Sequence, residues 1–358
     1  MGEARTGGEA ALSGVTAELD AALRHAAAQA PGSAAFAELL DSLHVHVGAG
    51  KLIRPRLVEL GWRPATAAPA PPSGRAAVDR IGAAFELLHT ALLVHDDVID
   101  RDVLRRGQPA VHASARHRLE ARGVPAAEAA HAGVAVALIA GDVLLTQAFR
   151  LAATCAADTA RAAEAAAVVF DAAAVTAAGE LEDVLLGLSR HTGEEPDPDR
   201  ILAMQRLKTA HYTVGAPLRA GALLAGADPG LARAMGEAGA DLGAAYQVID
   251  DVLGVFGDPG ETGKSADGDL REGKATVLTA HGRRIPAVRT LLDAGPATPA
   301  DIEAARRALE AAGAREHALD VAAELTVRAR ERIAALPLDE TVRAEFADAC
   351  HAVLTRRS

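Results

Sequence analysis

Residues 85–107 read Phe-Glu-Leu-Leu-His-Thr-Ala-Leu-Leu-Val-His-Asp-Asp-Val-Ile-Asp-Arg-Asp-Val-Leu-Arg-Arg-Gly, an apolar run followed by acidic and then basic residues. Apolar residues recur at helical spacing without Gly or Pro up to Val94, which predicts a buried helix. Asp96 and Asp100 lie four residues apart, so their side chains point to the same side of that helix, with Asp97 beside them. Carboxylates stacked in this way are costly to bury unless a cation lies between them.

The residue types around this run predict a site for a metal and a phosphate ester. Carboxylate oxygens suit Mg²⁺, which keeps several waters and is usually completed by a substrate phosphate. His89 lies two helical turns before Asp96 on nearly the same face. Arg105 and Arg106 follow in a segment broken by glycine and proline. Carboxylates beside an arginine pair indicate a multiply charged phosphate ester as ligand.

Composition restricts the fold and the partners. The chain has 358 residues, of which 50% are hydrophobic and 3% aromatic, and its formal net charge is −11. Abundant Ala, Leu, Arg and Glu favour helix, and no sustained alternating strand pattern is present, so an all-α fold is predicted. The negative charge argues against a nucleic-acid partner on a broad basic face.

The sequence also predicts where the protein resides. Cys155 and Cys350 are widely separated and form no metal or redox motif, which fits a reducing cytoplasm. The N-terminus lacks a signal-peptide hydrophobic region, and no uninterrupted apolar run reaches transmembrane length. We therefore expect a soluble cytoplasmic protein without a membrane span.

Hydrophobic patterning along the chain predicts one helical domain over residues 15–358, after a disordered N-terminus over residues 1–14. The Pro-rich stretch 62–75 is expected to be a surface loop between helices. Pro196 and Pro198 mark a further turn. The other predicted helical stretches are 15–47 with a break at Pro31-Gly32, 113–122, 126–157, 159–188, a helix from Ile201 that is interrupted near Gly215, 236–255 and much of 285–358.

A second apolar helix also leads into paired aspartates. Asp250 and Asp251 end this run, and Gln247 lies one turn earlier. Beyond them, glycines accompany Lys264 and Lys274, which predicts a mobile lid over a phosphate.

Other polar residues permit two interpretations each. Lys51 and Arg54 share a face if a helix restarts there, although the segment alone favours a solvated helix start. Lys208 is either a surface lysine or, given its small apolar neighbours, one that lines a site. Asp142 either pairs with a buried Arg or His, or faces the same cavity as the first carboxylates.

With both aspartate pairs in place, the chain from about residue 45 to 280 resembles the trans-isoprenyl diphosphate synthases, the polyprenyl synthetase family, and in particular bacterial geranylgeranyl diphosphate synthases. The second family motif reads Asp-Asp-x-x-Asp, whereas Gly254 holds its last position here, and whether Asp258 replaces the missing carboxylate is open. The matching elements, in family order, are Gly50-Lys51 through Arg54-Pro55, Phe85 to Gly107, Gly141-Asp142, Lys208-Thr209, Gln247 to Leu253, and Lys264 with Lys274.

The resemblance implies a homodimeric helical bundle around a central cavity, with Mg²⁺-dependent condensation of isopentenyl diphosphate and an allylic diphosphate. The residues implied to hold three Mg²⁺ ions with bound diphosphate are Asp96, Asp97, Asp100, Asp250 and Asp251, and Lys208 joins them in catalysis. Those implied to complete the allylic pocket are Arg105, Lys208, Thr209, Gln247 and Lys264. Those implied to hold isopentenyl diphosphate are Lys51, Arg54, His89 and Arg106.

The length of the product can be argued from the first helix. The growing tail is expected to run from the metals toward the helix N-terminus, where Ala91 lies roughly 7.5 Å before Asp96. Small Ala91 and modest Leu92 leave this channel open, which predicts geranylgeranyl diphosphate, with farnesyl or longer products as alternatives. The candidates for a deeper floor are Leu88, Leu145 and Phe149.

Two alternatives belong to other classes. A class I terpene cyclase also uses an aspartate-rich helix, but it normally carries an Asn/Asp-x-x-Ser/Thr-x-x-x-Glu element, and this chain contains no Asn. A non-catalytic partner subunit of a heteromeric synthase tends to lose the first aspartate motif, which is intact here.

Overall fold

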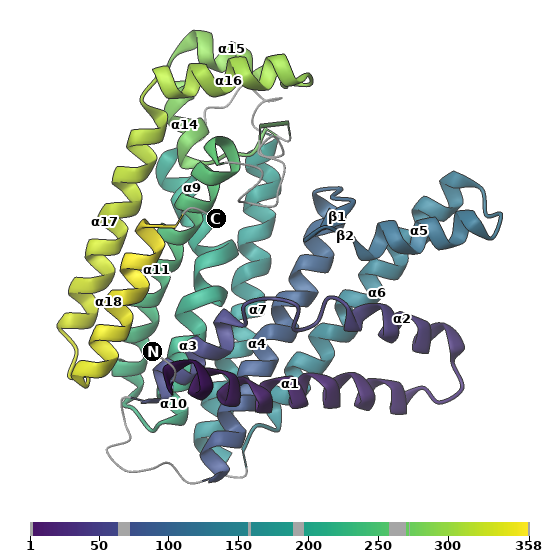
Figure 1. Cartoon of the computed structure of the whole chain (residues 1–358), viewed down its shortest axis with the longest axis vertical. Helices are drawn as coiled ribbons and strands as arrows, with labels where there is room; N and C mark the ends of the chain where they lie inside the picture. The colour runs from purple at the N-terminus through teal and green to yellow at the C-terminus, as the bar shows by residue number, and fades with distance from the viewer. Residues whose placement is uncertain are drawn as a thin grey trace. The chain divides into compact units, whose positions relative to one another are not determined.

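A computed structural model describes residues 3–63, 72–156, 159–188, 197–257, 270–271 and 273–356. The described residues are mostly helical, with one short hairpin as their strands, so the predicted all-α class is confirmed (Figure 1). The chain forms two compact units. Unit 1 comprises residues 1–170 with 217–228, and unit 2 comprises residues 171–216 with 229–358. The single domain over residues 15–358 stays a prediction.

Unit 1 is organised around α4 (Pro72–Ile99), which packs against α1, α3 and α6. Its middle carries large apolar side chains that are fully buried, among them Ile81, Leu87 and Leu88. The hairpin of β1 (Leu104–Arg105) and β2 (Gln108–Pro109) follows the C-terminal end of α4 (Figure 1). The other helices of this unit are α1 (Glu3–Gln29), α2 (Ala34–His44), α3 (Ile53–Trp62), α5 (Val111–Ala121), α6 (Ala126–Ala153), the first part of α7 (Thr159–Gly187) and most of α10 (Ala216–Leu224).

Unit 2 is organised around α11 (Pro229–Phe256), which packs along α17 (Figure 1) and also against η2 and α18. The element η2 (Arg206–Gly215) is a π-helix, whereas the sequence predicts an ordinary helix interrupted only near residue 215. Wider π-helical turns occur frequently at functional sites, and this one carries Lys208 and Thr209. The other helices are the rest of α7, α9 (Pro198–Gln205), α14 (Val277–Arg283), α15 (Pro286–Asp293), α16 (Pro299–Ala311), α17 (Ala314–Ala334) and α18 (Glu340–Leu354).

The structure differs from the sequence prediction at several helix ends. Helix α1 begins at Glu3, inside the stretch 1–14 predicted to be disordered, because its Ala and Glu residues favour helix despite the glycines. In the predicted loop 62–75, α3 extends through Trp62 and α4 begins at Pro72, while residues 64–71 lie outside the described part. Pro198 begins α9 instead of forming a turn. Proline fits a first helical turn because that position needs no backbone N–H donor.

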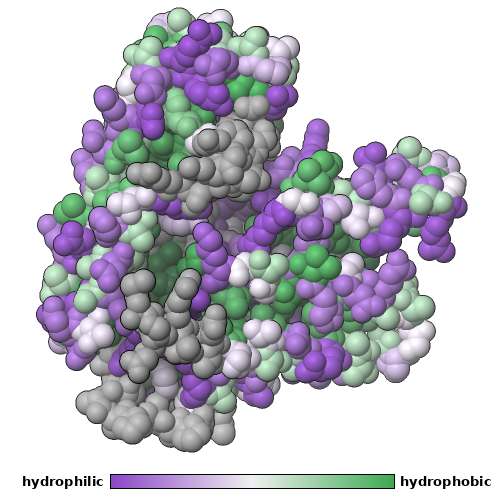
Figure 2. Space-filling model, in the orientation of Figure 1, coloured by the Kyte–Doolittle hydropathy of each residue, from purple (hydrophilic) through white to green (hydrophobic). Residues whose placement is uncertain are grey.

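Within the described part of the chain, two helices are long and apolar enough to cross a membrane, α6 and α7 from Ala160. Of their most apolar windows, 39% and 44% are buried in the protein. Core helices of water-soluble proteins share this length and composition, so the two helices do not establish a membrane span. Hydrophilic residues predominate on the visible surface of α5, in agreement with the charged helix predicted over residues 113–122 (Figure 2).

Within unit 1, α3 and α10 cross at two glycines that allow backbone to touch backbone. A methyl group at Gly221 would overlap the carbonyl oxygen of Val58, and one at Gly61 would overlap that of Leu218. A side chain at either position therefore requires the two helices to separate.

We predict that Gly221→Ala lowers the free energy of unfolding by about 1–3 kcal/mol, because it overfills this crossing. The matched control is Gly187→Ala, since a methyl group there meets nothing within 4 Å. In a helix, that control is expected to be neutral or to stabilise by up to about 1 kcal/mol. Urea unfolding measures both changes, and a Gly221→Ala protein as stable as the parent would contradict the close crossing.

Candidate active site

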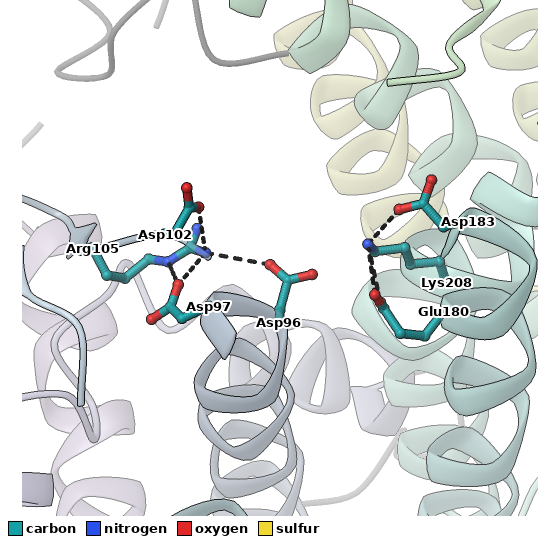
Figure 3. Close-up of polar contacts among 7 residues, drawn as sticks. All are labelled: Asp96, Asp97, Asp102, Arg105, Glu180, Asp183 and Lys208. Carbon is teal, nitrogen blue, oxygen red and sulfur yellow. Dashed lines mark hydrogen bonds and ion pairs between the residues drawn. The ribbon is translucent and has the colours of Figure 1, made fainter. Parts of the chain in front are cut away.

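Three carboxylates gather around one guanidinium at the end of α4, and we call Asp96, Asp97, Asp102 and Arg105 the first aspartate cluster. Arg105 Nε donates to Asp97 Oδ1 at 2.6 Å. Its Nη2 lies 3.3 Å from Asp96 Oδ2 and 3.3 Å from Asp102 Oδ2 (Figure 3). Arg105 comes from β1, so the hairpin after α4 returns a cation to the carboxylates that end the helix. The cost of stacking these carboxylates is thereby offset within unit 1.

Asp97 is the most buried member of this cluster, with 4% of its side chain exposed. Burial raises the pKa of its carboxyl from 3.8 to about 6, although Arg105 opposes this shift. Asp100 follows the last residue of α4, and its backbone N–H still donates to the Asp96 carbonyl at 2.8 Å. Helical hydrogen bonding thus continues to Asp100, as the spacing predicts.

The donor atoms of the first aspartate cluster fit a hard cation such as Mg²⁺. They are carboxylate oxygens, and the single guanidinium offsets only part of the charge of the three carboxylates. Among the described residues, no three Asp, Glu, His or Cys side chains are already arranged so that they could hold a metal ion. The assignment of the five aspartates as metal ligands therefore stays a prediction, and it requires Arg105 to share its carboxylates with the metal.

Basic residues lie behind the first aspartate cluster, on α3 and the segment before it, on α4 and on the hairpin. We call Lys51, Arg54, His89 and Arg106 the basic cluster. His89 and Arg54 are each 8% exposed. Burial lowers the pKa of His89 well below its usual value, and Arg54 and then Arg106 lower it further. A Cβ at Gly50 would lie 3.1 Å from Arg106 Nη2, so this guanidinium rests against the backbone beside Lys51. The structure therefore brings both predicted arginines to a neutral His89, with exposed Lys51 next to them.

Two further titratable groups lie beside the basic cluster and are absent from the sequence prediction. Glu86 is 2% exposed, and burial raises its pKa while Arg54 and Arg106 oppose the shift. Burial also lowers the pKa of His46, with Arg106 as the second cause. The spacing of Glu86 three residues before His89 was a signal that sequence reasoning missed.

In unit 2, the aspartates at the end of α11 are held by side chains from three segments. Asp251 is 7% exposed and accepts from Gln205 Nε2 at 2.5 Å and from Gln247 Nε2 at 2.8 Å. Asp250 accepts from Arg356 Nη1 at 2.9 Å, and that guanidinium also lies 4.3 Å from the centroid of the Tyr246 ring. We call Asp250, Asp251, Gln205, Gln247 and Arg356 the second aspartate cluster.

Lys208 is not a freely solvated lysine. Its Nζ donates to Asp183 Oδ2 at 2.6 Å and lies 3.0 Å from Glu180 Oε2 (Figure 3). Its side chain is 17% exposed, and Gly179 lets the backbone of α7 lie against the backbone of η2 at this point. The structure therefore shows an ion-paired, partly buried lysine with Thr209 next to it on η2, and the role of Lys208 in lining a site stays a prediction.

Of the remaining predicted residues, some lie outside the described part of the chain, and others contact neighbouring segments. Lys264, Asp258 and the predicted lid lie outside the described residues, apart from Gly257 and the residues near Lys274. The carbonyl of Lys274 accepts from Thr279 Oγ1 at 2.9 Å. The carboxylate of Asp142 is exposed and lies 3.9 Å from His95 Nε2, so it pairs with a histidine.

The partners in these clusters were the part that sequence reasoning missed. Asp102 lies three residues before Arg105, which was a usable signal for a local ion pair. No local pattern pointed to the other partners, because each comes from a distant segment: Glu180, Asp183, Gln205 and Arg356.

Comparison with known proteins identifies the family to which the chain belongs. The polyprenyl synthetase family model matches residues 37–311, and the chain belongs to that family. It is 33% identical to a geranylfarnesyl diphosphate synthase of Aeropyrum pernix over 83% of this chain and 86% of the relative. It is 36% identical to a geranylgeranyl diphosphate synthase of Mycobacterium tuberculosis over 72% and 68% of the two chains.

A solved structure shows the same fold at higher coverage. Geranylgeranyl pyrophosphate synthase from Corynebacterium glutamicum, complexed with isoprenyl diphosphate and magnesium, superposes with a TM-score of 0.86. The match covers 98% of each chain at 30% sequence identity. The chain is thus a trans-isoprenyl diphosphate synthase, whereas its relatives differ in the product lengths that their names state.

We predict that Asp97→Asn stabilises the metal-free protein at neutral pH. A carboxyl whose pKa is raised from 3.8 to about 6 stabilises the fold while protonated, and this contribution is lost as the pH rises through 6. The advantage of the Asn variant should therefore grow by roughly 1 kcal/mol between pH 5 and pH 7. Urea unfolding in a chelator measures it, and an advantage that shrinks as the pH rises would contradict the raised pKa.

Proposed function

We propose that this protein condenses isopentenyl diphosphate with an allylic diphosphate, head to tail and in the trans configuration, to form geranylgeranyl diphosphate in a Mg²⁺-dependent reaction. The observation that carries the proposal is the pairing of two kinds of site within unit 1. A cluster of carboxylates that needs a cation lies at the end of α4, and the basic cluster around neutral His89 lies behind it. The two kinds of site suit two diphosphate substrates, one whose diphosphate stays attached during the reaction and one whose diphosphate leaves.

The basic cluster suits the substrate whose diphosphate stays attached. Arg54, Arg106 and Lys51 offer fixed positive charge, and neutral His89 adds a hydrogen-bonding group without further repulsion between cations. These groups can bind a diphosphate without a Lewis acid, so isopentenyl diphosphate is held there without activation of its C–O bond. Its double bond is then available as the nucleophile.

The aspartate clusters suit the substrate whose diphosphate leaves. Mg²⁺ bound by these carboxylates would supply Lewis-acid stabilisation of the charge that develops on the leaving group. Arg105 and Lys208 are already oriented by their carboxylate partners, so they can donate to phosphate oxygens with little rearrangement. The allylic C–O bond breaks, the double bond of isopentenyl diphosphate attacks the carbocation, and the released diphosphate accepts the lost proton. No protein nucleophile is required.

The proposed product length is argued from the size of the side chains on α4 on the N-terminal side of the aspartates. Leu88 and Ala91 are completely buried there, while Leu92 is half-buried. On the neighbouring helix α6, Phe149 stacks edge-to-face on Phe170 with ring centroids 5.3 Å apart, and Leu145 lies one turn earlier. A small residue at position 91 with larger ones behind it supports geranylgeranyl diphosphate. Farnesyl or longer products stay the alternatives, among them the geranylfarnesyl diphosphate in the names of two relatives.

We further propose a cytoplasmic homodimer. Leu138 and Ile139 on α6 are 47% and 53% exposed, and Phe170 on α7 is 41% exposed, apolar side chains that a second copy would cover. Cys155 and Cys350 are both free and buried, which is compatible with a reducing compartment.

The test of the reaction is incubation of purified protein with Mg²⁺, isopentenyl diphosphate and each allylic primer, with products sized by chromatography. We expect geranylgeranyl diphosphate from the parent and at least a hundredfold loss of rate in Asp96→Ala, because a metal-binding carboxylate is removed. Asp20→Ala, an exposed aspartate of α1, is the matched control and should retain full activity. A cyclised hydrocarbon, or no elongation of any primer, would refute the proposed reaction.

Substitutions on α4 test product length in both directions. Ala91→Phe should shorten the main product, because an aromatic ring fills the channel, and Leu88→Ala should lengthen it by removing its floor. Leu23→Ala on α1 is an equally buried control that should leave the product unchanged. Product profiles that respond to neither α4 substitution would show that the tail takes another path.

A further inference from the structure

Gln205 is a buried amide whose position the core does not explain. It is the last residue of α9, it is 3% exposed, and its neighbours Ile201 and Met204 belong to the apolar core of unit 2. Its Nε2 donates to Asp251 Oδ2 at 2.5 Å. Its Oε1 is buried and has no hydrogen-bond partner among the described residues.

This arrangement costs stability. A buried polar atom without a partner loses its hydration and gains nothing in return. Methionine has almost the same length and shape, and would fill the same space without that cost. What glutamine provides at this position, and methionine cannot, is the hydrogen bond to Asp251.

That hydrogen bond completes a clamp on one carboxylate. Gln247 donates to Oδ1 of Asp251 from one turn earlier on α11, while Gln205 donates to Oδ2 from another helix. Two donors on the two oxygens fix both side-chain torsions of Asp251. The adjacent Asp250 is held differently, because 32% of its side chain is exposed and its partner is Arg356, which follows the end of α18.

We propose that Gln205 is a positioning residue, which holds the Asp251 carboxylate so that the second aspartate pair keeps its geometry for a metal-bound diphosphate. The inference rests on the proposed function for the role of that pair. It adds that a single amide on α9 determines how well the pair binds, in a motif whose third carboxylate is replaced by Gly254. With fewer carboxylates in the motif, the orientation of those that remain matters more.

The experiment uses Mn²⁺ as the probe, in the presence of inorganic diphosphate, with free Mn²⁺ measured by electron paramagnetic resonance. Gln205→Met should weaken the Mn²⁺ binding that Asp251→Asn also weakens, by about tenfold, the usual effect of losing a hydrogen bond behind a metal ligand. Gln147→Met is the matched control, since Gln147 is a buried glutamine of unit 1 that accepts from Arg150, and its variant should bind Mn²⁺ like the parent.

A double variant separates positioning from a general effect on folding. If Gln205 acts through Asp251, then Gln205→Met combined with Asp251→Asn should bind Mn²⁺ no more weakly than Asp251→Asn alone. Parental Mn²⁺ binding in Gln205→Met would overturn the proposal, and so would additive losses in the double variant. Both readouts are independent of turnover, so a protein that binds Mn²⁺ and diphosphate but elongates no primer would refute the proposed function and leave the role of Gln205 intact.

Discussion

Compensation of carboxylate charge at the ends of apolar helices is the constraint on which this structure depends. Helices α4 and α11 each bury apolar residues along their length and carry aspartates in their last two turns, which cannot lose their hydration without a partner. At α4 the partner is a cation, Arg105, returned by a hairpin of a few residues. At α11 the more buried aspartate receives two amide donors, and the more exposed one receives an arginine.

The arginine partner at α4 and the amide donors at α11 have different chemical consequences. Arg105 offsets part of the negative charge of the first aspartate cluster. In the proposed reaction the carboxylates would hold the metal, and Arg105 would donate to the diphosphate. The amides on Asp251 change no charge at all, and they restrict its orientation instead. Lys208 resembles Arg105 in that its ammonium is held by the carboxylates of Glu180 and Asp183 on α7. In the proposed reaction, a phosphate would compete with these carboxylates for it.

The sequence was sufficient for the helices and for their reactive ends. Apolar periodicity followed by aspartates identified α4 and α11, and the local arginines after α4 were identified with them. The partners of Asp250, Asp251 and Lys208 could not be predicted in this way, because they come from positions 106, 46 and 25 residues away in the chain. A glutamine at the end of an apolar helix or an arginine near the C-terminus has no periodicity to distinguish it. The start of α9 at Pro198 was misjudged for a related reason, since proline is compatible with both a turn and a first helical turn.

The ion pair between Arg356 and Asp250 makes the last described residue of the chain part of the second aspartate cluster. In the proposed function, a divalent ion that binds Asp250 would compete with this guanidinium, so loading of the site would exchange one cation for another. Arg356, which follows α18, would thus serve as the counter-ion of Asp250 while no metal is bound.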